Sequence, residues 1–145
     1  MPCFKNAQEI NEISLLDRAF HYGDGCFSTA RVRHGKIELE HLHMARLHLS
    51  CERLLLKADL SLIQKCLALL QQQFLEVNGT LKIIISRGEG QRGYSLPDHP
   101  ADVWVFFYPK VVDDFQVEKI KSGVLQQALG LTMPSLVGLK SLNRL

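Results

Sequence analysis

Two short apolar runs, residues 81–85 and 103–108, constrain the fold of this chain more than any other feature. Both are rich in β-branched and aromatic side chains, which is typical of well-buried central strands. Between them, residues 86–95 hold three glycines and two arginines. Glycine makes that backbone permissive, and arginine suits an anion. The runs therefore predict two core strands that flank a cationic loop.

A β-hairpin is predicted earlier in the chain. Residues 26–32 and 36–39 are β-like runs, and His34-Gly35 between them is typical of a hairpin turn because glycine tolerates a positive φ. Residues 17–25, which hold two glycines and two aspartates, are predicted to form a loop. The first 13 residues are expected to be an entry strand or loop.

Two helices are predicted between the hairpin and the first apolar run. Over residues 40–57, apolar side chains recur at steps of three and four, as on the buried face of a helix. A second helix is expected from Ser61, a plausible N-cap, until Asn78-Gly79 stops it. The apolar positions of the first helix are Met44, Leu47, Cys51, Leu54 and Leu55.

Composition excludes several classes of protein. A chain of 145 residues with 46% hydrophobic and 22% charged residues is long enough to bury one core. Its formal charge of +2 falls short of the dense basic surface of nucleic-acid-binding proteins. No stretch approaches the ~18 apolar residues of a membrane helix or has the form of a signal peptide, so a cytoplasmic location is expected. The four cysteines contain no C-x-x-C pair and are expected to be reduced and mostly buried.

Four segments carry a family resemblance: DRAFHYGDGCFSTARVRHGKI (residues 17–37), HMARL (43–47), LKIIISRGEGQRGYS (81–95) and GLKSLNRL (138–145). In order and with similar spacing, they resemble the amino-terminal half of 4-amino-4-deoxychorismate lyases. Those enzymes belong to the fold-type-IV group that uses pyridoxal 5′-phosphate (PLP). The glycine-arginine loop and the lysine motif are the most specific parts of the resemblance.

The resemblance implies that Lys140 bonds the PLP aldehyde and that Arg46 binds its phosphate. The chemistry needs a primary amine that condenses with the aldehyde, leaves when the substrate amine replaces it, and then moves protons. Only lysine supplies this, and its usual pKa near 10.4 must then be lowered by burial and nearby positive charge. A phosphate favours a planar, permanently charged donor such as arginine. The alternatives are a surface lysine and a solvated helix arginine.

Further site residues are implied at two loops. Arg87, Arg92 and Tyr94 lie in a segment that resembles a family loop near the active site. Arginine in that loop suits the two carboxylates of aminodeoxychorismate. Tyr22, with Gly23 and Asp24, lies in a segment that resembles a family loop near the cofactor and the dimer interface. An exposed charged loop and a simple turn are the respective alternatives. No metal site is expected from His41, His43 and His48, because His41 and His43 lie on different faces of the 40–57 helix and no carboxylate or thiolate set completes a site.

By resemblance, the fold class is α/β: residues 1–115 form the amino-terminal α+β domain of a two-domain enzyme. Residues 116–145 are then a linker and the start of a cofactor-binding carboxyl-terminal domain, which is truncated after one helical turn. Within this stretch, residues 117–132 favour strands, because Gly123 and Gly130 would weaken a helix. The implied reaction is the lyase conversion of 4-amino-4-deoxychorismate to 4-aminobenzoate and pyruvate, in a homodimer. A PLP-dependent aminotransferase of the branched-chain or D-amino-acid type is the alternative, and a fragment that only packs or binds is a third. The 145-residue piece alone is expected to be inactive.

Overall fold

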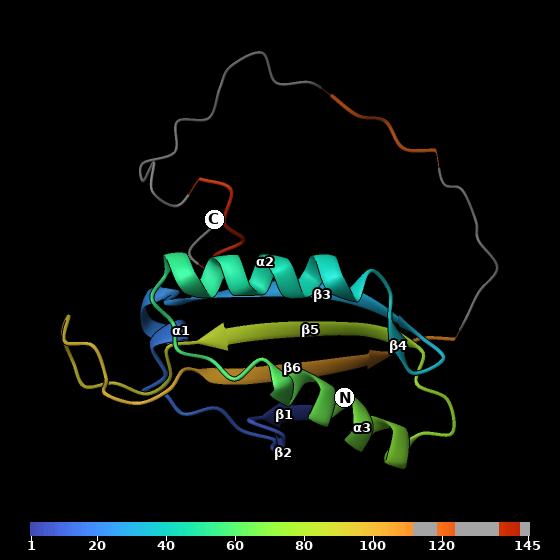
Figure 1. Ribbon diagram of the computed structural model, residues 1–145, viewed down its shortest axis with the longest axis horizontal. Helices are drawn as coiled ribbons and strands as arrows, with labels where there is room; N and C mark the ends of the chain where they lie inside the picture. Colours follow the sequence, from blue (N-terminus) through green and yellow to red (C-terminus); the bar gives the residue numbers. More distant parts are fainter. Residues whose placement is uncertain (112–118, 124–136, 143–145) are drawn as a thin grey trace.

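The chain folds into one antiparallel sheet with two long helices, in a computed structural model that describes residues 1–111, 119–123 and 137–142. The elements in chain order are β1 (Cys3–Lys5), β2 (Gln8–Glu9), α1 (Arg18–Tyr22), β3 (Gly25–Arg33), β4 (Lys36–Ile37), α2 (Glu40–Arg53), α3 (Ser61–Gln73), β5 (Gly79–Ser86) and β6 (Asp102–Pro109). The strands lie in the order β2-β1-β6-β5-β3-β4 (Figure 1). All pairings between these strands are antiparallel.

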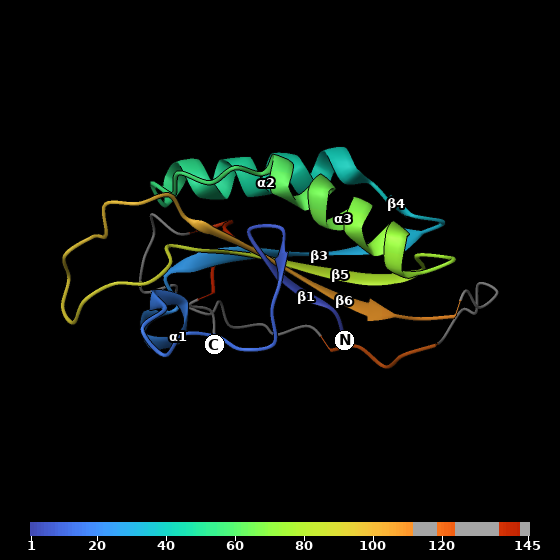
Figure 2. The same cartoon turned by 90° about the horizontal axis from the view of Figure 1, so that it is seen from below.

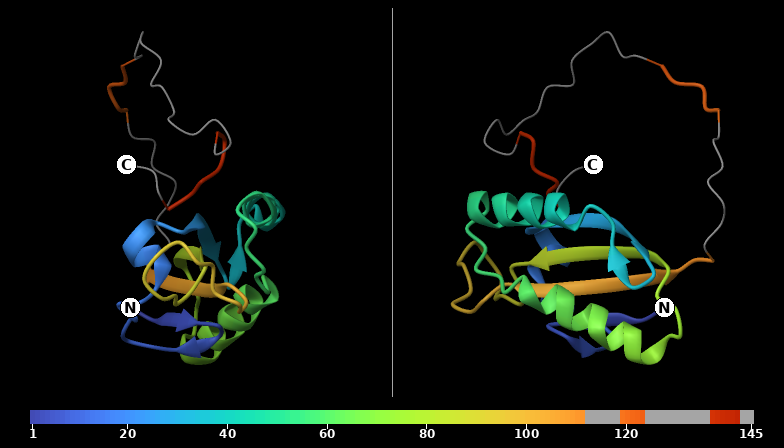
Figure 3. Two further views of the ribbon diagram at one scale, coloured as in Figure 1. Left: turned by 90° about the vertical axis from the view of Figure 1, so that its left-hand side faces the viewer. Right: turned by 45° about the vertical axis from the view of Figure 1, so that its right-hand side comes forward.

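The two long helices cover one face of the sheet. Both long helices lie on the same side of the sheet, α2 over β3 and α3 towards β6 (Figures 2 and 3). Along β3, the side chains of Cys26, Ser28 and Ala30 are buried beneath the helices, whereas those of Phe27 and Thr29 alternate with them on the opposite face. This alternation follows from the two-residue repeat of a strand. The hydrophobic core therefore fills the space between sheet and helices.

The predicted core strands are confirmed. Residues 81–85 lie in β5 and residues 103–108 in β6, and the two strands pair with each other in the middle of the sheet. The predicted hairpin turn is confirmed too, since His34 and Gly35 have φ values of 48° and 72°. β4 is shorter than expected. It ends at Ile37, because the backbone of Leu39 turns left-handed (φ 52°) to begin α2.

The first predicted helix is confirmed with a different end. Leu47 and Cys51 are buried, and Met44 and Leu54 pack against the core. Leu55 was expected in the same stripe, and this was wrong. α2 ends at Arg53, and Leu55 has a φ of 54° and is 78% exposed. Once the helix stops, the helical repeat no longer decides where the next side chain points.

The second predicted helix begins at Ser61, but Ser61 is not its cap. The Asp59 carboxylate accepts hydrogen bonds from the Ser61 backbone N–H (3.0 Å) and hydroxyl (2.6 Å), and so satisfies donors that the start of the helix leaves free. The helix also ends earlier than Asn78, at Gln73, because Phe74 is already extended.

The predicted loop at residues 17–25 contains the short helix α1. Asp17 is its N-cap and accepts a hydrogen bond from Ala19 N (2.8 Å), and Gly23 ends it with a φ of 61°. Residues 1–13 contain the strands β1 and β2, as expected. The strands favoured over 117–132 fall largely outside the described residues, and residues 119–123 have no regular structure.

The four cysteines are free, and three of them, Cys26, Cys51 and Cys66, are buried, which confirms the expectation of reduced thiols. Within the described ranges, no helix is long and apolar enough to cross a membrane.

Candidate functional site

Residues 137–142 lie against the edge of β3. The Phe27 N–H donates to the Lys140 carbonyl oxygen (3.0 Å), and the Leu142 N–H donates to the Gly25 carbonyl oxygen (2.9 Å). β4 pairs only with the far end of β3, so this segment extends the sheet where β4 is absent. Leu139 is 1% exposed and anchors the segment in the protein. The predicted helix around residue 142 is replaced, up to that residue, by a strand-like contact.

Gly25 is required for this contact. A Cβ atom there would lie 2.2 Å from the Ile85 carbonyl oxygen and 2.8 Å from a methyl group of Leu142. Both distances are shorter than real contacts, so only glycine lets β5 and the 137–142 segment approach β3 from both sides. This residue thereby sets the position of Lys140.

The Lys140 side chain lies beside an aromatic ring. Its Nζ is 4.8 Å from the centre of the Phe27 ring, and the Nζ of Lys82 is 6.0 Å from the same centre. Cations are attracted to the faces of aromatic rings at such distances. The arrangement leaves a primary amine half-buried at the sheet edge, next to an apolar surface.

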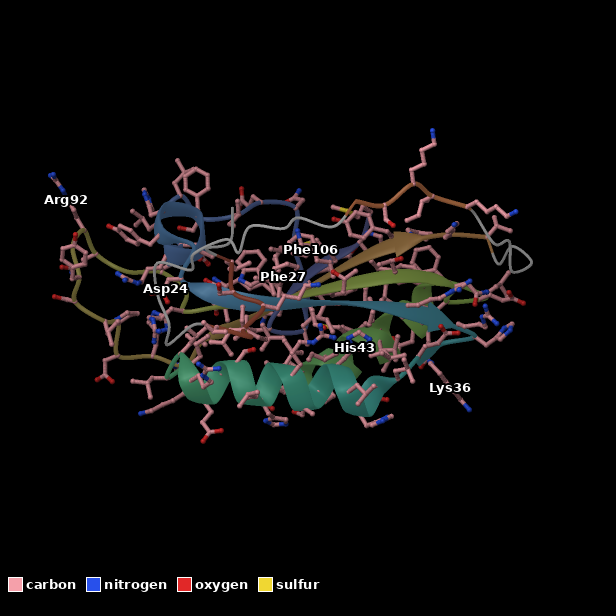
Figure 4. All side chains as sticks on the ribbon, turned by 90° about the horizontal axis from the view of Figure 1, so that it is seen from above. Asp24, Phe27, Lys36, His43, Arg92 and Phe106 are labelled. Carbon is pink, nitrogen blue, oxygen red and sulfur yellow. The ribbon has the colours of Figure 1, made fainter. Side chains whose placement is uncertain are left out.

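Helix α2 adds a histidine and an arginine on the other side of β3. His43 lies between α2 and β3 (Figure 4), and its Nδ1 is hydrogen-bonded to the hydroxyl of the buried Ser28 (2.8 Å). Burial lowers the pKa of His43 below its usual value, and the positive charges of Arg46 and Lys140 lower it further. The lowered pKa of His43 favours its uncharged imidazole, and the charges of Arg46 and Lys140 both contribute to this shift.

Arg46 makes no ion pair with any acid in the described part of the chain. Among the described residues, neither Arg46 nor Lys140 has an acid as ion-pair partner, and the charges of both act on His43, so this part of the molecule is locally positive. Such a site suits a bound anionic group, which both cations would stabilise. The structure thus places Lys140 and Arg46, the two residues of the expected cofactor site, near the same histidine.

Arg87 belongs to a different cluster. Its Nε donates to both oxygens of Asp24 (2.9 and 3.0 Å), and its terminal nitrogens donate to the carbonyl oxygens of Leu54 (2.7 Å) and Leu55 (3.1 Å) after α2. Arg18 binds the same aspartate at 2.8 Å. Burial alone would raise the pKa of Asp24, but the hydrogen bonds and charges of the two arginines bring it below its usual value. Arg87 therefore holds the end of β5 to the end of α2.

The other predicted substrate residues lie on the surface. Tyr94 is 95% exposed, and Arg92 lies at the tip of its loop, pointing away from the sheet (Figure 4). Tyr22 in α1 is 43% exposed, with the Arg18 guanidinium 4.8 Å from its ring centre. Within one copy of the chain, the structure does not bring these three side chains to Lys140. Their role in substrate binding stays a prediction.

Sequence reasoning did not single out Phe27, Ser28, His43 as a hydrogen-bonding group, or Lys82. The alternation along residues 26–32 contained the information on Phe27 and Ser28, because adjacent residues of a strand face opposite sides of the sheet. The contact between β3 and residues 137–142 joins parts of the chain more than a hundred positions apart, which a local pattern does not encode. In the described residues, no group of three or more histidine, cysteine, aspartate or glutamate side chains is arranged to hold a metal ion.

The described part of the chain is a two-layer α+β domain with Lys140 at the edge of its sheet and Arg46 on the neighbouring helix. The model of the amino-transferase class IV family matches residues 25–145, so the chain belongs to that family.

Particular relatives are narrower in function. The chain is 32% identical to an aminodeoxychorismate lyase from Vibrio harveyi, with 92% of this chain and 49% of that protein covered. It is 28% identical to a D-alanine aminotransferase from Staphylococcus epidermidis, covering 83% of this chain and 45% of the relative. The crystal structure of 4-amino-4-deoxychorismate lyase from Pseudomonas aeruginosa is similar with a TM-score of 0.66 and 35% identity, over 74% of this chain and 39% of that one. This chain thus spans about half the length of the curated relatives it matches.

Proposed function

We propose that this chain is part of a PLP-dependent lyase that converts 4-amino-4-deoxychorismate to 4-aminobenzoate and pyruvate. Its higher identity to an aminodeoxychorismate lyase (32%) than to a D-alanine aminotransferase (28%) supports the lyase over the transferase. The observation that carries the proposal is the position of Lys140, whose amine lies 4.8 Å from the centre of the Phe27 ring, beside a positive site.

The described residues fit the cofactor. PLP has an aldehyde, an aromatic ring and a phosphate of about two negative charges. Lys140 supplies the amine for the aldehyde, and Arg46 supplies a guanidinium that no acid of the described residues neutralises. His43 carries no negative charge, so it does not compete with the cofactor phosphate for Lys140 or Arg46. We assign Lys140 and Arg46 as the cofactor-binding residues on this basis.

Lys140 would act twice in the reaction. It holds the cofactor until the substrate amine displaces it, and as a free amine it then takes the proton from the carbon beside the substrate nitrogen. When bound, the cofactor supplies the electron sink for that step. The hydrogen bond between the Ser28 hydroxyl and His43 Nδ1 fixes the imidazole between α2 and β3. A fixed, uncharged neighbour keeps the positive charge of the site confined to Lys140 and Arg46.

The assignment is tested by trapping. Borohydride reduction of the complete protein to which this chain belongs, after treatment with PLP, followed by peptide mass spectrometry, is expected to find the cofactor on Lys140. Lys140→Ala should abolish both the label and turnover, because the leaving amine and the base are lost together. The matched control Lys36→Ala changes an exposed lysine of β4 and should affect neither. A label on another lysine would contradict the assignment.

The reaction type is tested separately. Release of 4-aminobenzoate from aminodeoxychorismate is expected from the lyase. Reciprocal formation of keto acids from amino and keto acid mixtures would instead identify an aminotransferase, as the D-alanine aminotransferase match would suggest.

We further propose that the protein is cytoplasmic and forms a homodimer. In each subunit, residues 1–115 would form the amino-terminal domain and residues 116–145 the link to a second domain. Leu15, Leu16 and Phe20, around α1, are each more than half exposed. A group of apolar side chains of this kind suits an interface between protein subunits. Sedimentation equilibrium would measure the assembly, and substitution of Phe20 by serine should weaken it.

A further inference from the structure

One imidazole joins the two ends of the loop between β5 and β6, residues 87–101. His99 Nε2 lies 2.8 Å from the carbonyl oxygen of Glu89, and His99 Nδ1 lies 2.8 Å from the carbonyl oxygen of Pro100. Glu89 lies shortly after the end of β5, and Pro100 lies shortly before the start of β6. We call this pair of hydrogen bonds the His99 clasp.

Both hydrogen bonds of the clasp form in only one protonation state of His99. A carbonyl oxygen accepts hydrogen bonds and donates none, so each of the two ring nitrogens must carry a hydrogen. The neutral imidazole has one N–H group, whereas the imidazolium has two. In the neutral ring, the lone pair of one nitrogen would face a carbonyl oxygen at 2.8 Å, and that contact would have to open. The geometry of the clasp is therefore that of the imidazolium.

The surroundings of His99 favour its charged form. The two carbonyl oxygens raise the pKa of His99 above its usual value; burial opposes them, the carboxylate of Asp102 raises the pKa further, and the charge of Lys5 lowers it. Lys5 and Asp102 are themselves an ion pair at 3.0 Å. The other charged side chains of this region are those of Lys57, Arg87, Glu89 and Asp98.

Gly88 makes room for the imidazole. Its φ is 85°, and a Cβ atom there would lie 2.6 Å from His99 Cε1 and 2.9 Å from a carboxylate oxygen of Asp102. Any side chain at this position would displace the ring, so the approach of His99 to the end of β5 needs glycine. The Gly88 carbonyl oxygen accepts a hydrogen bond from the Arg18 N–H (2.9 Å) at the start of α1. The clasp is thus built against the backbone, although His99 is exposed on its other side.

The loop that the clasp closes carries two of the residues predicted to bind substrate. Arg92 lies at its tip (Figure 4), and Tyr94 follows. Two further hydrogen bonds tie the middle of the loop to α1 and the chain before it. Arg18 Nη1 donates to the Gly93 carbonyl oxygen (3.2 Å), and the Gly90 N–H donates to a backbone carbonyl oxygen before α1 (3.1 Å). The position of the tip therefore depends on these contacts and on the clasp together.

We propose that His99 is a positioning residue, which as an imidazolium holds the ends of the β5–β6 loop together and so places Arg92 and Tyr94 for substrate binding. This inference rests on the proposed function. Because the pKa of folded His99 is raised, the clasp is complete below the usual histidine pKa of about 6.5 and is lost as the pH rises through the folded pKa. Substrate binding by the loop then weakens over the same pH range.

Nuclear magnetic resonance of the complete protein tests the clasp without turnover. The ring nitrogens of His99 and the amides of Gly90 and Gly93 are followed from about pH 5 to about pH 9. We expect both ring nitrogens to carry hydrogen at the acid end, and the two glycine amides to titrate with the midpoint of His99. His99→Gln should abolish that titration. The matched control His48→Gln, which changes an exposed histidine of α2, should leave it unchanged.

Steady-state kinetics over the same pH range test the positioning. At the acid end, the KM of His99→Gln for aminodeoxychorismate is expected to be about fivefold above that of the wild type, the effect of one hydrogen bond. At the alkaline end the two KM values should be equal, and the ratio of the two kcat values should not change with pH. Other titrating groups are common to both proteins and cancel in these ratios. His99→Lys keeps a positive charge without two opposed donors, so it should behave like His99→Gln.

Three results would overturn the proposal. Glycine amides that titrate in His99→Gln as they do in the wild type would show that the loop ends do not depend on His99. A KM ratio that is constant over the pH range would remove the positioning role, and a wild-type KM in His99→Lys at the acid end would assign the effect to charge alone. The proposed function fails differently. A protein whose glycine amides follow His99 but that releases no 4-aminobenzoate from aminodeoxychorismate contradicts the lyase and leaves the clasp intact.

Discussion

Arg46 lies one helical turn beyond His43 on α2, and its charge lowers the pKa of that imidazole. If its guanidinium binds the cofactor phosphate, Arg46→Ala should weaken PLP binding by on the order of 2–4 kcal/mol, the value of a partly buried charge-assisted contact. Arg46→Lys should recover part of this, because an ammonium group offers charge without the bidentate geometry. Equilibrium titration with PLP measures both. The control Arg31→Ala removes an exposed arginine that pairs with Glu38, and it should leave the affinity for PLP unchanged. Unchanged affinity in Arg46→Ala would refute the assignment.

Asp24 shows how a single carboxylate couples structure to pH. Its pKa is below the usual value, because two arginines outweigh the effect of burial. A carboxyl group with a lowered folded-state pKa stabilises the fold above its unfolded pKa of about 3.9, and this stability is lost as the pH falls through the folded pKa. Asp24→Asn should therefore reduce the acid dependence of the unfolding free energy below about pH 4.

The same substitution should lower stability at neutral pH. Arg18 and Arg87 would lose their shared carboxylate while both side chains remain largely buried. The expected loss is on the order of 2 kcal/mol, since an uncompensated charge is left behind. Urea denaturation over a pH series measures both effects. If wild type and Asp24→Asn unfold with the same pH dependence, Asp24 contributes nothing through its charge.

At the scale of elements, the docking of residues 137–142 depends on the start of β3. Gly25→Ala would place a methyl group 2.2 Å from the Ile85 carbonyl oxygen, a backbone atom that cannot turn aside. We expect a loss of about 1–3 kcal/mol in the free energy of unfolding. Gly123→Ala is the matched control, because no atom lies within 4 Å of its Cβ position. Chemical denaturation compares the two variants, and equal stability would show that β3 tolerates a side chain there.

The elements that the sequence predicted well are those with a strong repeat. β5 and β6 were identified from continuous apolar runs, and α2 from steps of three and four, because burial on one or both faces leaves a pattern in the residues themselves. Element ends were predicted less well. Ser61 is the first residue of α3 rather than its cap, and its backbone N–H donates to Asp59. Leu55 leaves the helical stripe, since hydrogen bonds and local backbone angles decide these positions.

The candidate site, too, was predicted from the sequence only in part. Lys140 and Arg46 were predicted from motif resemblance and their cofactor roles stay predictions; both charges contribute to the lowered pKa of His43. The interpretation of Arg87 as a substrate residue did not anticipate that its donors are directed at Asp24 and at the end of α2. That geometry arises from elements brought together only by the tertiary fold, so no spacing in the sequence contained it.

At the scale of the whole molecule, the residues proposed to bind the cofactor, Lys140 and Arg46, would account for only part of a PLP site. A PLP phosphate brings about two negative charges, and the ring nitrogen needs a carboxylate partner to make the ring a strong electron sink. Arg46 is the one guanidinium assigned to the phosphate, and none of the acids in the described residues has been assigned to the ring nitrogen. The curated relatives are about twice as long as this chain.

The 145-residue chain expressed alone is therefore expected to fold at least in its sheet and helices, but neither to hold PLP tightly nor to release 4-aminobenzoate. The Arg46 guanidinium balances only part of the phosphate charge. With so few contacts to the protein, bound PLP is expected to dissociate readily. Titration of the chain with PLP, followed by the absorption of the lysine-bound cofactor, measures the first property, and an assay with aminodeoxychorismate measures the second. Circular dichroism and the Trp104 resonance check that the chain is folded. A stable absorption band together with turnover would show that residues 1–145 hold every group the reaction needs, and that the partners of the phosphate and ring nitrogen lie within this chain.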